Sequence, residues 1–215
     1  MTRVTIGFLT FLLLAANCFG QNNVETLTQA AYSRLSGSAS LEFADFQCPF
    51  CAQQARDLRR LQAEYLDTLT VTFKNFPLAF HKQSKAAHLA ALAAREQGKF
   101  WEMHDLIFGH PEHLSSTDFD RYALELGLDM NKFHNFQTDL AQSAVIDKDI
   151  TDGKALGVNA TPTFIASGQK LIGRQSYERL KQIIAAELKG EPWGTQRRST
   201  WTFPMLLPRV RNPLR

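Results

Sequence analysis

The chain has little cysteine, no large excess of charge of either sign and no internal repeat. Of its 215 residues, three are cysteine, 44% are hydrophobic and 21% are charged, and the formal net charge is +3. This composition excludes a disordered, collagen-like or low-complexity protein. The length allows one good-sized core, or at most two small ones.

Positive charge is concentrated at the two ends of the chain. Residues 191–215 carry five arginines against Glu191, and Arg3 lies at the start, so residues 21–190 have a net charge of about −2. A domain this close to neutrality is not a nucleic-acid binder by charge, and we expect no nucleic-acid partner. The basic, Trp-containing segment 191–215 also holds four of the eight prolines and shows no periodicity, which predicts a disordered or loosely attached tail.

Long apolar runs are also missing. The uncharged run at residues 6–16 has eleven residues, whereas a bilayer-spanning helix takes about 20. The run follows Arg3 and precedes Cys18 and Gly20, small residues at −3 and −1 of a cut after Gly20, which is typical of a secretory signal peptide. We expect residues 1–20 to be a signal peptide and the protein to be exported, and favour this over an uncleaved anchor or a lipoprotein.

Loss of the leader would leave two cysteines, Cys48 and Cys51, in Cys-x-x-Cys spacing. No odd thiol would then remain to pair at random in an oxidising compartment. The preceding apolar residues 41–46 predict a buried strand, and Pro49 suits the first position of a helix. Cys48 would therefore face unpaired helix N–H groups and the positive end of the helix dipole.

This setting favours the thiolate of the first cysteine. A free cysteine has a pKa of about 8.5, which such an environment lowers to roughly 3.5–7.5. We predict Cys48 as the attacking and leaving sulfur, and Cys51, one turn inward, as the resolving thiol. A zinc site would need two more ligands, and the pair His110 and His113 lies in a loop-like stretch between helices. A purely structural disulfide would close too short a loop to add much stability. We expect no metal and no cofactor.

Hydrophobic periodicity and turn residues predict the order strand, helix, strand, helical block, hairpin, helix. Without the helical block this is a small mixed sheet with helices packed on it, an α/β fold. The expected segments are a docking helix over 23–35, a strand over 41–46, a helix from Pro49 to about Tyr65, a strand over 69–76, helices throughout 84–157, a hairpin of 163–166 and 170–172, and a helix from Ser176 to about Leu188.

Four motifs resemble those of the DsbA-like thiol:disulfide oxidoreductases of bacterial envelopes, over roughly residues 38–188. This resemblance implies a thioredoxin fold with a helical domain inserted at about 84–157, within a domain spanning 21–190. It also implies a periplasmic enzyme whose partners are unfolded or partly folded exported proteins and a membrane redox protein that recycles it. The four motifs are Phe43-Ala44-Asp45-Phe46-Gln47-Cys48-Pro49-Phe50-Cys51, Lys74-Asn75-Phe76-Pro77-Leu78, Gln97-Gly98-Lys99-Phe100-Trp101 and Val158-Asn159-Ala160-Thr161-Pro162-Thr163-Phe164.

The resemblance also implies roles for individual residues. Cys48 and Cys51 match the family's redox pair. Pro162 matches a cis-proline that faces this pair and presents the backbone of Thr161 to a bound substrate chain; the alternative is an ordinary trans turn. Glu42 matches a buried acid that assists proton transfer near the second cysteine; the alternative is an edge-facing carboxylate.

The chain departs from the strongest oxidants of the family, which carry Pro-His between the cysteines. Here the dipeptide is Pro49-Phe50, and Phe50 supplies neither charge nor a hydrogen-bond donor to Cys48. We expect Pro49, Phe50 and Thr161 to contact the substrate. Thr161 before Pro162 also occurs in isomerase-type relatives, which dimerise through a separate N-terminal domain, and residues 21–38 are too short for one. We therefore favour a monomeric oxidase over an isomerase or reductase, or a non-catalytic, chaperone-like peptide-binding module.

Overall fold

The computed structural model describes residues 38–65, 69–166 and 169–189. The predicted signal peptide, the docking helix over 23–35 and the tail over 191–215 lie outside these residues. In the described part of the chain, no helix is long and apolar enough to cross a membrane.

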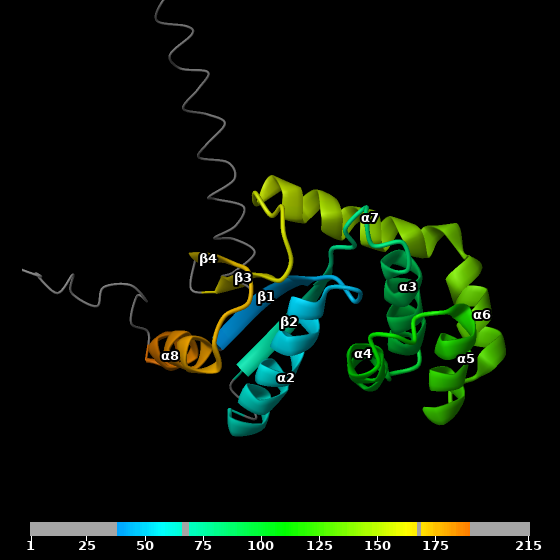
Figure 1. Ribbon diagram of the computed structural model, residues 1–215, viewed down its shortest axis with the longest axis horizontal. Coiled ribbons are helices and arrows are strands. Elements are labelled where there is room, and N and C mark those ends of the chain that lie inside the picture. The colour runs from blue at the N-terminus through cyan, green and yellow to red at the C-terminus, as the bar shows by residue number, and fades with distance from the viewer. Residues whose placement is uncertain (1–37, 66–68, 167–168, 190–215) are drawn as a thin grey trace, which may run out of the picture.

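The centre of the fold is a four-stranded sheet in the order β2-β1-β3-β4 (Figure 1). Strand β1 (Ser38–Ala44) pairs in parallel with β2 (Leu69–Asn75) and antiparallel with β3 (Thr163–Ala166), which forms a hairpin with β4 (Gln169–Ile172). Parallel neighbours require a crossover connection, and helix α2 (Pro49–Glu64) supplies it. The hairpin and the mixed sheet are as predicted.

Strand β1 ends earlier than the sequence predicts. The apolar run over 41–46 includes Asp45 and Phe46, but the strand stops at Ala44. The Asp45 carbonyl instead accepts a hydrogen bond from the Cys48 N–H at 3.0 Å, which closes a turn into α2. The turn brings the first cysteine directly to the start of the helix.

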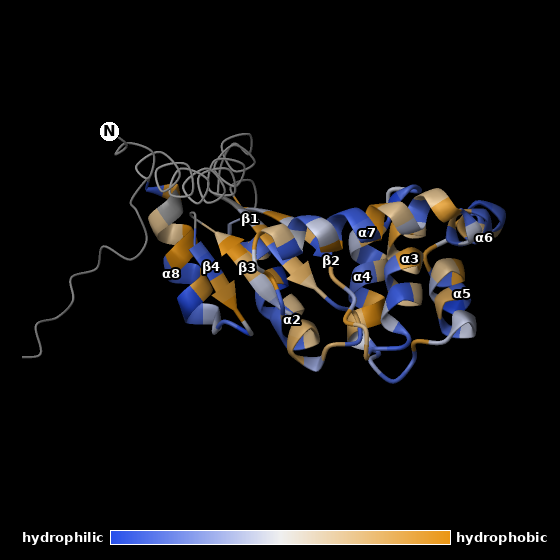
Figure 2. Ribbon diagram, turned by 90° about the horizontal axis from the view of Figure 1, so that it is seen from above, coloured by the Kyte–Doolittle hydropathy of each residue, from blue (hydrophilic) through white to orange (hydrophobic). Residues whose placement is uncertain are grey.

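Five helices lie between β2 and β3 in the described chain. Figure 2 shows that they extend to one side of the sheet, with α5 and α6 farthest from α8 (Tyr177–Leu188). Ser115 and Asp118 form a capping box at the start of α5. The inserted helices are α3 (Ser84–Arg95), α4 (Phe100–Gly109), α5 (Ser116–Glu125), α6 (Met130–Thr138) and α7 (Leu140–Ala155).

Helix α2 is shared by two hydrophobic clusters. Its first half, with Cys51 and Ala55, packs with the inserted helices around residues such as Tyr122. Its second half, with Leu61, packs with the sheet and α8 around residues such as Ile183. The start of α2 therefore lies where the sheet and the inserted helices meet. The predicted fold class, a mixed sheet with an inserted helical domain, is confirmed.

Candidate active site

The two cysteines lie at the start of α2. Cys48 is the residue that caps the helix, Pro49 is the first helical residue, and Cys51 follows in the first turn. The Cys48 carbonyl accepts hydrogen bonds from the N–H groups of Cys51 and Ala52, both at 3.1 Å. Cys48 is 5% exposed and Cys51 is fully buried, and both are free thiols. Phe50 between them is 58% exposed. An incoming sulfur can therefore reach Cys48 more easily than Cys51.

The surroundings shift the pKa values of the two thiols in opposite directions. The pKa of Cys48 is lowered from 9.0 to about 5, chiefly by a hydrogen bond from the Cys51 side chain. Burial opposes this, while the N–H groups of Cys51 and Phe50 lower the pKa further. Burial raises the pKa of Cys51, and the neighbouring Cys48 and the charge of Glu42 raise it more. At neutral pH the site therefore holds one thiolate, at Cys48, beside one protonated thiol.

This asymmetry predicts selective alkylation of the reduced protein. At pH 6 a group with a pKa of about 5 is about nine-tenths ionised, so iodoacetamide should label Cys48 well before Cys51. Mass spectrometry of peptides from a short reaction gives the ratio. The denatured protein is the control, because both cysteines then react slowly and alike. Equal labelling in the folded protein would contradict the assignment of Cys48 as the nucleophile.

A second segment, distant in sequence, completes the site. The Thr161–Pro162 peptide bond is cis, as predicted, and lies just before β3. In its protonated form, the Cys48 thiol donates a hydrogen bond to the Thr161 carbonyl at 3.5 Å. Because β3 pairs with β1, this loop is held against the start of α2. The predicted role of Thr161 and Pro162 in holding a substrate chain stays a prediction.

Glu42 lies in the middle of the sheet. Its register partners are Phe73 on β2 and Phe164 on β3, and it is only 2% exposed. The carboxyl is therefore buried rather than facing an edge of the sheet. Burial raises the pKa of Glu42 from 4.5 to about 8. Its charge also raises the pKa of Cys51, which places it within electrostatic reach of the second cysteine. Its predicted role in proton transfer stays a prediction.

The sequence alone does not single out Asp45, which holds the site together. This fully buried carboxylate accepts hydrogen bonds from the N–H of Gln47, the N–H of Leu78 and the hydroxyl of Ser84, each at 2.7 Å, and pairs with His81 Nδ1 at 2.9 Å. It thereby ties the loop after β2 to the turn before the cysteines. The sequence feature that could have indicated Asp45 is an acid at the end of an apolar strand, directly before the start of a helix.

Backbone contacts connect Asp45 to both thiols. Its N–H donates to Cys51 Sγ at 3.5 Å, and its carbonyl accepts from the Cys48 N–H. Across the described residues, no group of three or more His, Cys, Asp or Glu side chains could hold a metal ion. The geometry therefore presents a thiol pair with one activated sulfur, a neighbouring cis-peptide loop and one buried acid.

Comparison with known proteins identifies the family. The model of the thioredoxin family matches residues 38–186, and the chain therefore belongs to that family. A thioredoxin-like oxidoreductase from Silicibacter pomeroyi superposes with a TM-score of 0.64 at 26% identity, over 70% of this chain and 86% of that one. The thiol-disulfide exchange protein alpha-DsbA2 from Wolbachia pipientis superposes with a TM-score of 0.67 at 19% identity, over 78% and 97%.

A third solved structure, a periplasmic thioredoxin-like protein from Salmonella enterica, has a TM-score of 0.60 at 20% identity, over 71% of this chain and 84% of that one. The fold is thus that of DsbA-like thiol-disulfide exchange proteins, as predicted. The predicted enzyme class, a thiol:disulfide oxidoreductase, agrees with the family and with these neighbours.

The curated proteins that are similar in sequence are named as antiporters, unlike the solved structures that are similar in fold. The Na(+)/H(+) antiporter NhaA 3 of Salinispora tropica is 36% identical over 145 residues, which is 67% of this chain and 22% of that protein. The Na(+)/H(+) antiporter NhaA 1 of Salinispora arenicola is 32% identical over 151 residues, 70% of this chain and 23% of that protein. The chain thus spans about a fifth of the length of these relatives.

Proposed function

We propose that the protein is an exported thiol:disulfide oxidoreductase that introduces disulfides into unfolded or partly folded proteins of the bacterial envelope. The observation that carries the proposal is the unequal thiol pair, which lies beside the Thr161–Pro162 loop. Cys48 is ionised and slightly exposed, whereas Cys51 is fully buried and protonated. A pair of this kind can form a mixed disulfide through one sulfur and resolve it through the other.

In the oxidising direction the reaction begins with the Cys48–Cys51 disulfide. A thiolate of the client protein attacks Cys48 Sγ, the bond between the two cysteines breaks, and Cys51 leaves as a thiolate that takes up a proton. The second client thiolate then attacks the client sulfur of the mixed disulfide and expels Cys48 as a thiolate. Two electrons pass from the client dithiol to the enzyme, which ends reduced. A membrane redox partner would return it to the disulfide form.

Each residue of the site has a part in this sequence. The low pKa of Cys48 makes it a good leaving group, since thiols of lower pKa leave faster. Glu42, with its pKa near 8, is suited to exchange the proton of Cys51. The backbone of Thr161, beside Cys48, would bind the client chain, and Pro49 and the exposed Phe50 would contact it.

The oxidising direction follows from the same electrostatics. Groups that stabilise the Cys48 thiolate stabilise the reduced form of the enzyme, and this makes the disulfide a stronger oxidant. Export and a periplasmic location are supported by the leader-like residues 1–20 and by the periplasmic protein of similar fold. We propose that the protein acts as a monomer.

The direct test combines an equilibrium and a rate. The oxidised protein is equilibrated with glutathione buffers to obtain its reduction potential, and is then mixed with a reduced, unfolded client whose activity depends on disulfides. We expect an oxidising potential and stoichiometric formation of client disulfides. A reducing potential, with activity only toward scrambled disulfides, would indicate an isomerase or reductase. Client binding without thiol exchange would indicate a peptide-binding module.

Phe50→His should shift the protein toward stronger oxidation. A histidine at this exposed position can donate a hydrogen bond, or supply positive charge, to the Cys48 thiolate, which Phe50 does not. One hydrogen bond to a charged group is worth about 1.5–3 kcal/mol, and about 30 mV corresponds to roughly 1.4 kcal/mol for this couple. We therefore expect a rise of a few tens of millivolts and a lower Cys48 pKa, measured by glutathione equilibrium and thiolate absorbance. An unchanged or more reducing variant would show that position 50 does not tune the pair.

A further inference from the structure

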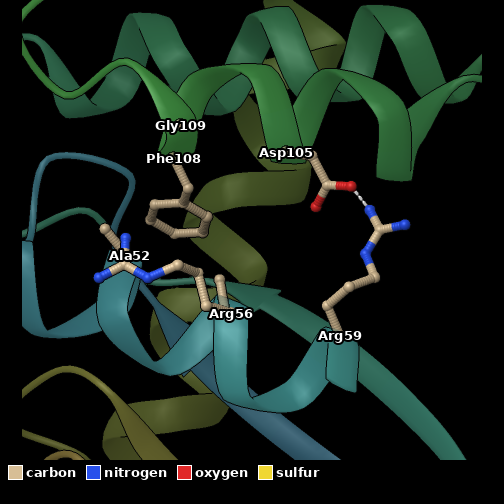
Figure 3. Close-up of a pocket in the computed structure, with 7 residues that line it drawn as sticks. Ala52, Arg56, Arg59, Asp105, Phe108 and Gly109 are labelled. Carbon is tan, nitrogen blue, oxygen red and sulfur yellow. Dashed lines mark ion pairs between the residues drawn. The ribbon is translucent and has the colours of Figure 1, made fainter. Parts of the chain in front are cut away.

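A pocket lies between α2 and α4, close to the redox pair but outside it. Its apolar surface comes from Ala52, Ala55 and Phe108, and its charged groups are Arg56, Arg59 and Asp105. Figure 3 shows the Arg59–Asp105 ion pair bridging the two helices at one end of the pocket. The side chain of Arg56 extends toward the opposite end, where Ala52 lies. The pocket therefore combines an apolar wall with an ion pair at one end and the Arg56 side chain toward the other.

The charges in this pocket are unbalanced. Arg59 is neutralised by Asp105, which also accepts from His104 Nδ1 at 3.0 Å. Arg56 is exposed and makes no ion pair with any residue in the described part of the chain. One positive charge thus remains free beside the apolar wall of the pocket, where its planar guanidinium can form a charge-assisted, two-point bond to a carboxylate.

The pocket begins one helical turn from the catalytic sulfur. Ala52, the wall residue nearest the cysteines, is four residues after Cys48 and donates its N–H to the Cys48 carbonyl. At 1.5 Å of rise per residue this is about 6 Å along α2, and Arg56 follows about 6 Å further on. An extended chain advances roughly 3.3–3.6 Å per residue. A client residue two to four positions from the reacting cysteine therefore reaches the pocket.

We propose that this pocket is a subsite for an acidic side chain of the client protein. Arg56 binds this side chain while the client cysteine reacts with Cys48. The inference rests on the proposed function and adds a substrate preference to it. The carboxylate pairs with the Arg56 guanidinium while its methylene groups lie against Ala52, Ala55 and Phe108. The class of substrate is thus a cysteine-containing segment with Asp or Glu two to four residues away.

The test uses the full chain in its disulfide form and synthetic dithiol peptides with blocked ends. Matched peptides carry Glu or Gln three residues before, or three residues after, the reacting cysteine. We expect the Glu peptide to be oxidised about fivefold faster than the Gln peptide at one of the two positions, the upper range for an exposed ion pair. The preference should shrink as salt is raised.

Variants of Arg56 and Arg60 test which arginine causes the preference for the Glu peptide. Arg56→Gln should bring the Glu/Gln rate ratio to about one, Arg56→Glu should reverse it, and Arg56→Lys should keep part of it. Arg60→Gln is the matched control, because Arg60 is on the same helix but pairs with Glu64 and lies over the Tyr177 ring at 4.0 Å. An equal loss in Arg60→Gln, or no loss in Arg56→Gln, would overturn the subsite.

Oxidation of dithiothreitol, which has no carboxylate, separates the two proposals. If the protein and its variants oxidise dithiothreitol but the Glu/Gln ratio is one in the unmodified chain, the subsite is wrong and the oxidoreductase stands. If dithiothreitol is not oxidised, the proposed function is wrong and the subsite falls with it.

Discussion

Cys48→Ser should reduce the oxidation of client dithiols to the uncatalysed rate, whereas Cys51→Ser should accumulate a stable mixed disulfide. Without Cys48 Sγ, the one cysteine thiol left among the described residues is that of Cys51, which is fully buried and protonated. With Cys48 alone, the thiolate attacks a client disulfide, forms a bond to one client sulfur and releases the other as a thiolate. Only that released thiolate can then reverse the step, because the resolving sulfur is missing. Non-reducing electrophoresis and mass spectrometry detect the adduct.

Cys51→Ala is the informative companion variant. The hydrogen bond from the Cys51 side chain is the largest cause of the low Cys48 pKa. Serine can still donate such a bond and alanine cannot, so the thiolate titration of Cys51→Ala should have a higher midpoint than that of Cys51→Ser. Mixed disulfides at Cys51 in Cys48→Ser, or equal adduct yields in Cys48→Ser and Cys51→Ser, would contradict the division of roles.

The parts of the site that lie close together in sequence could be predicted from it. A strand, two cysteines and a proline at the start of a helix form a local unit, whose chemistry follows from the helix N-terminus. The cis peptide before β3 could be expected only through the resemblance carried by Val158 to Phe164, because nothing in its local sequence requires it to face Cys48. The β1–β3 pairing that holds it there is a contact between segments about 120 residues apart.

Other parts depend on contacts between distant segments and could not be predicted. Asp45 takes its partners from Gln47, Leu78, His81 and Ser84, and their convergence is decided by how the inserted helices pack on the sheet. The pocket beside Arg56 likewise exists only because α4 lies against α2. On α2 alone, that arginine has the pattern of an ordinary solvated residue.

Glu42→Gln should raise stability at neutral pH. In the folded protein the carboxyl has a pKa of about 8 and is mostly neutral at pH 7, whereas in the unfolded chain it ionises near 4.5. An acid whose pKa is raised by folding contributes its stability below pH 4.5 and loses it progressively up to about pH 8. At pH 7 the loss is about 3 kcal/mol at 1.36 kcal/mol per pKa unit, and glutamine does not suffer it.

The expected result is a difference in unfolding free energy that grows from near zero at pH 4 to about 3 kcal/mol at pH 7. The comparison with the unmodified chain at each pH is essential, because the buried His88 and His104, with pKa values of about 4 and 3, act in the opposite sense. Their contribution is present above pH 6.5 and is lost as the pH falls, equally in both proteins. Denaturant titrations at several pH values give the difference, and a difference independent of pH would contradict a buried, neutral Glu42.

Asp149→Asn provides a matched control with the opposite sign. Asp149 is also buried, but its carboxylate accepts from Lys74 Nζ at 2.7 Å and from the N–H and side-chain amide of Asn75. The same change from charge to amide there weakens charge-assisted hydrogen bonds and should lower the unfolding free energy by about 1–3 kcal/mol. The gain in Glu42→Gln is thus specific to a carboxyl that burial keeps neutral.

Glu42→Gln should lower the rate of thiol exchange even though it raises the unfolding free energy. Cys51 must release its proton when it attacks a mixed disulfide and regain one when it leaves, and its burial raises its pKa. A carboxyl with a pKa near 8 can accept and return that proton, whereas an amide cannot. We expect the Cys51-dependent step to slow by roughly 100-fold, at the lower end of general acid–base effects.

In the unmodified chain this step should titrate with a midpoint near pH 8, and the variant should lose that titration. Stopped-flow measurement of mixed-disulfide resolution across pH 6–9 tests this directly. If the variant keeps both the rate of mixed-disulfide resolution and the midpoint near pH 8, Glu42 does not transfer protons for the thiol pair and only lowers stability.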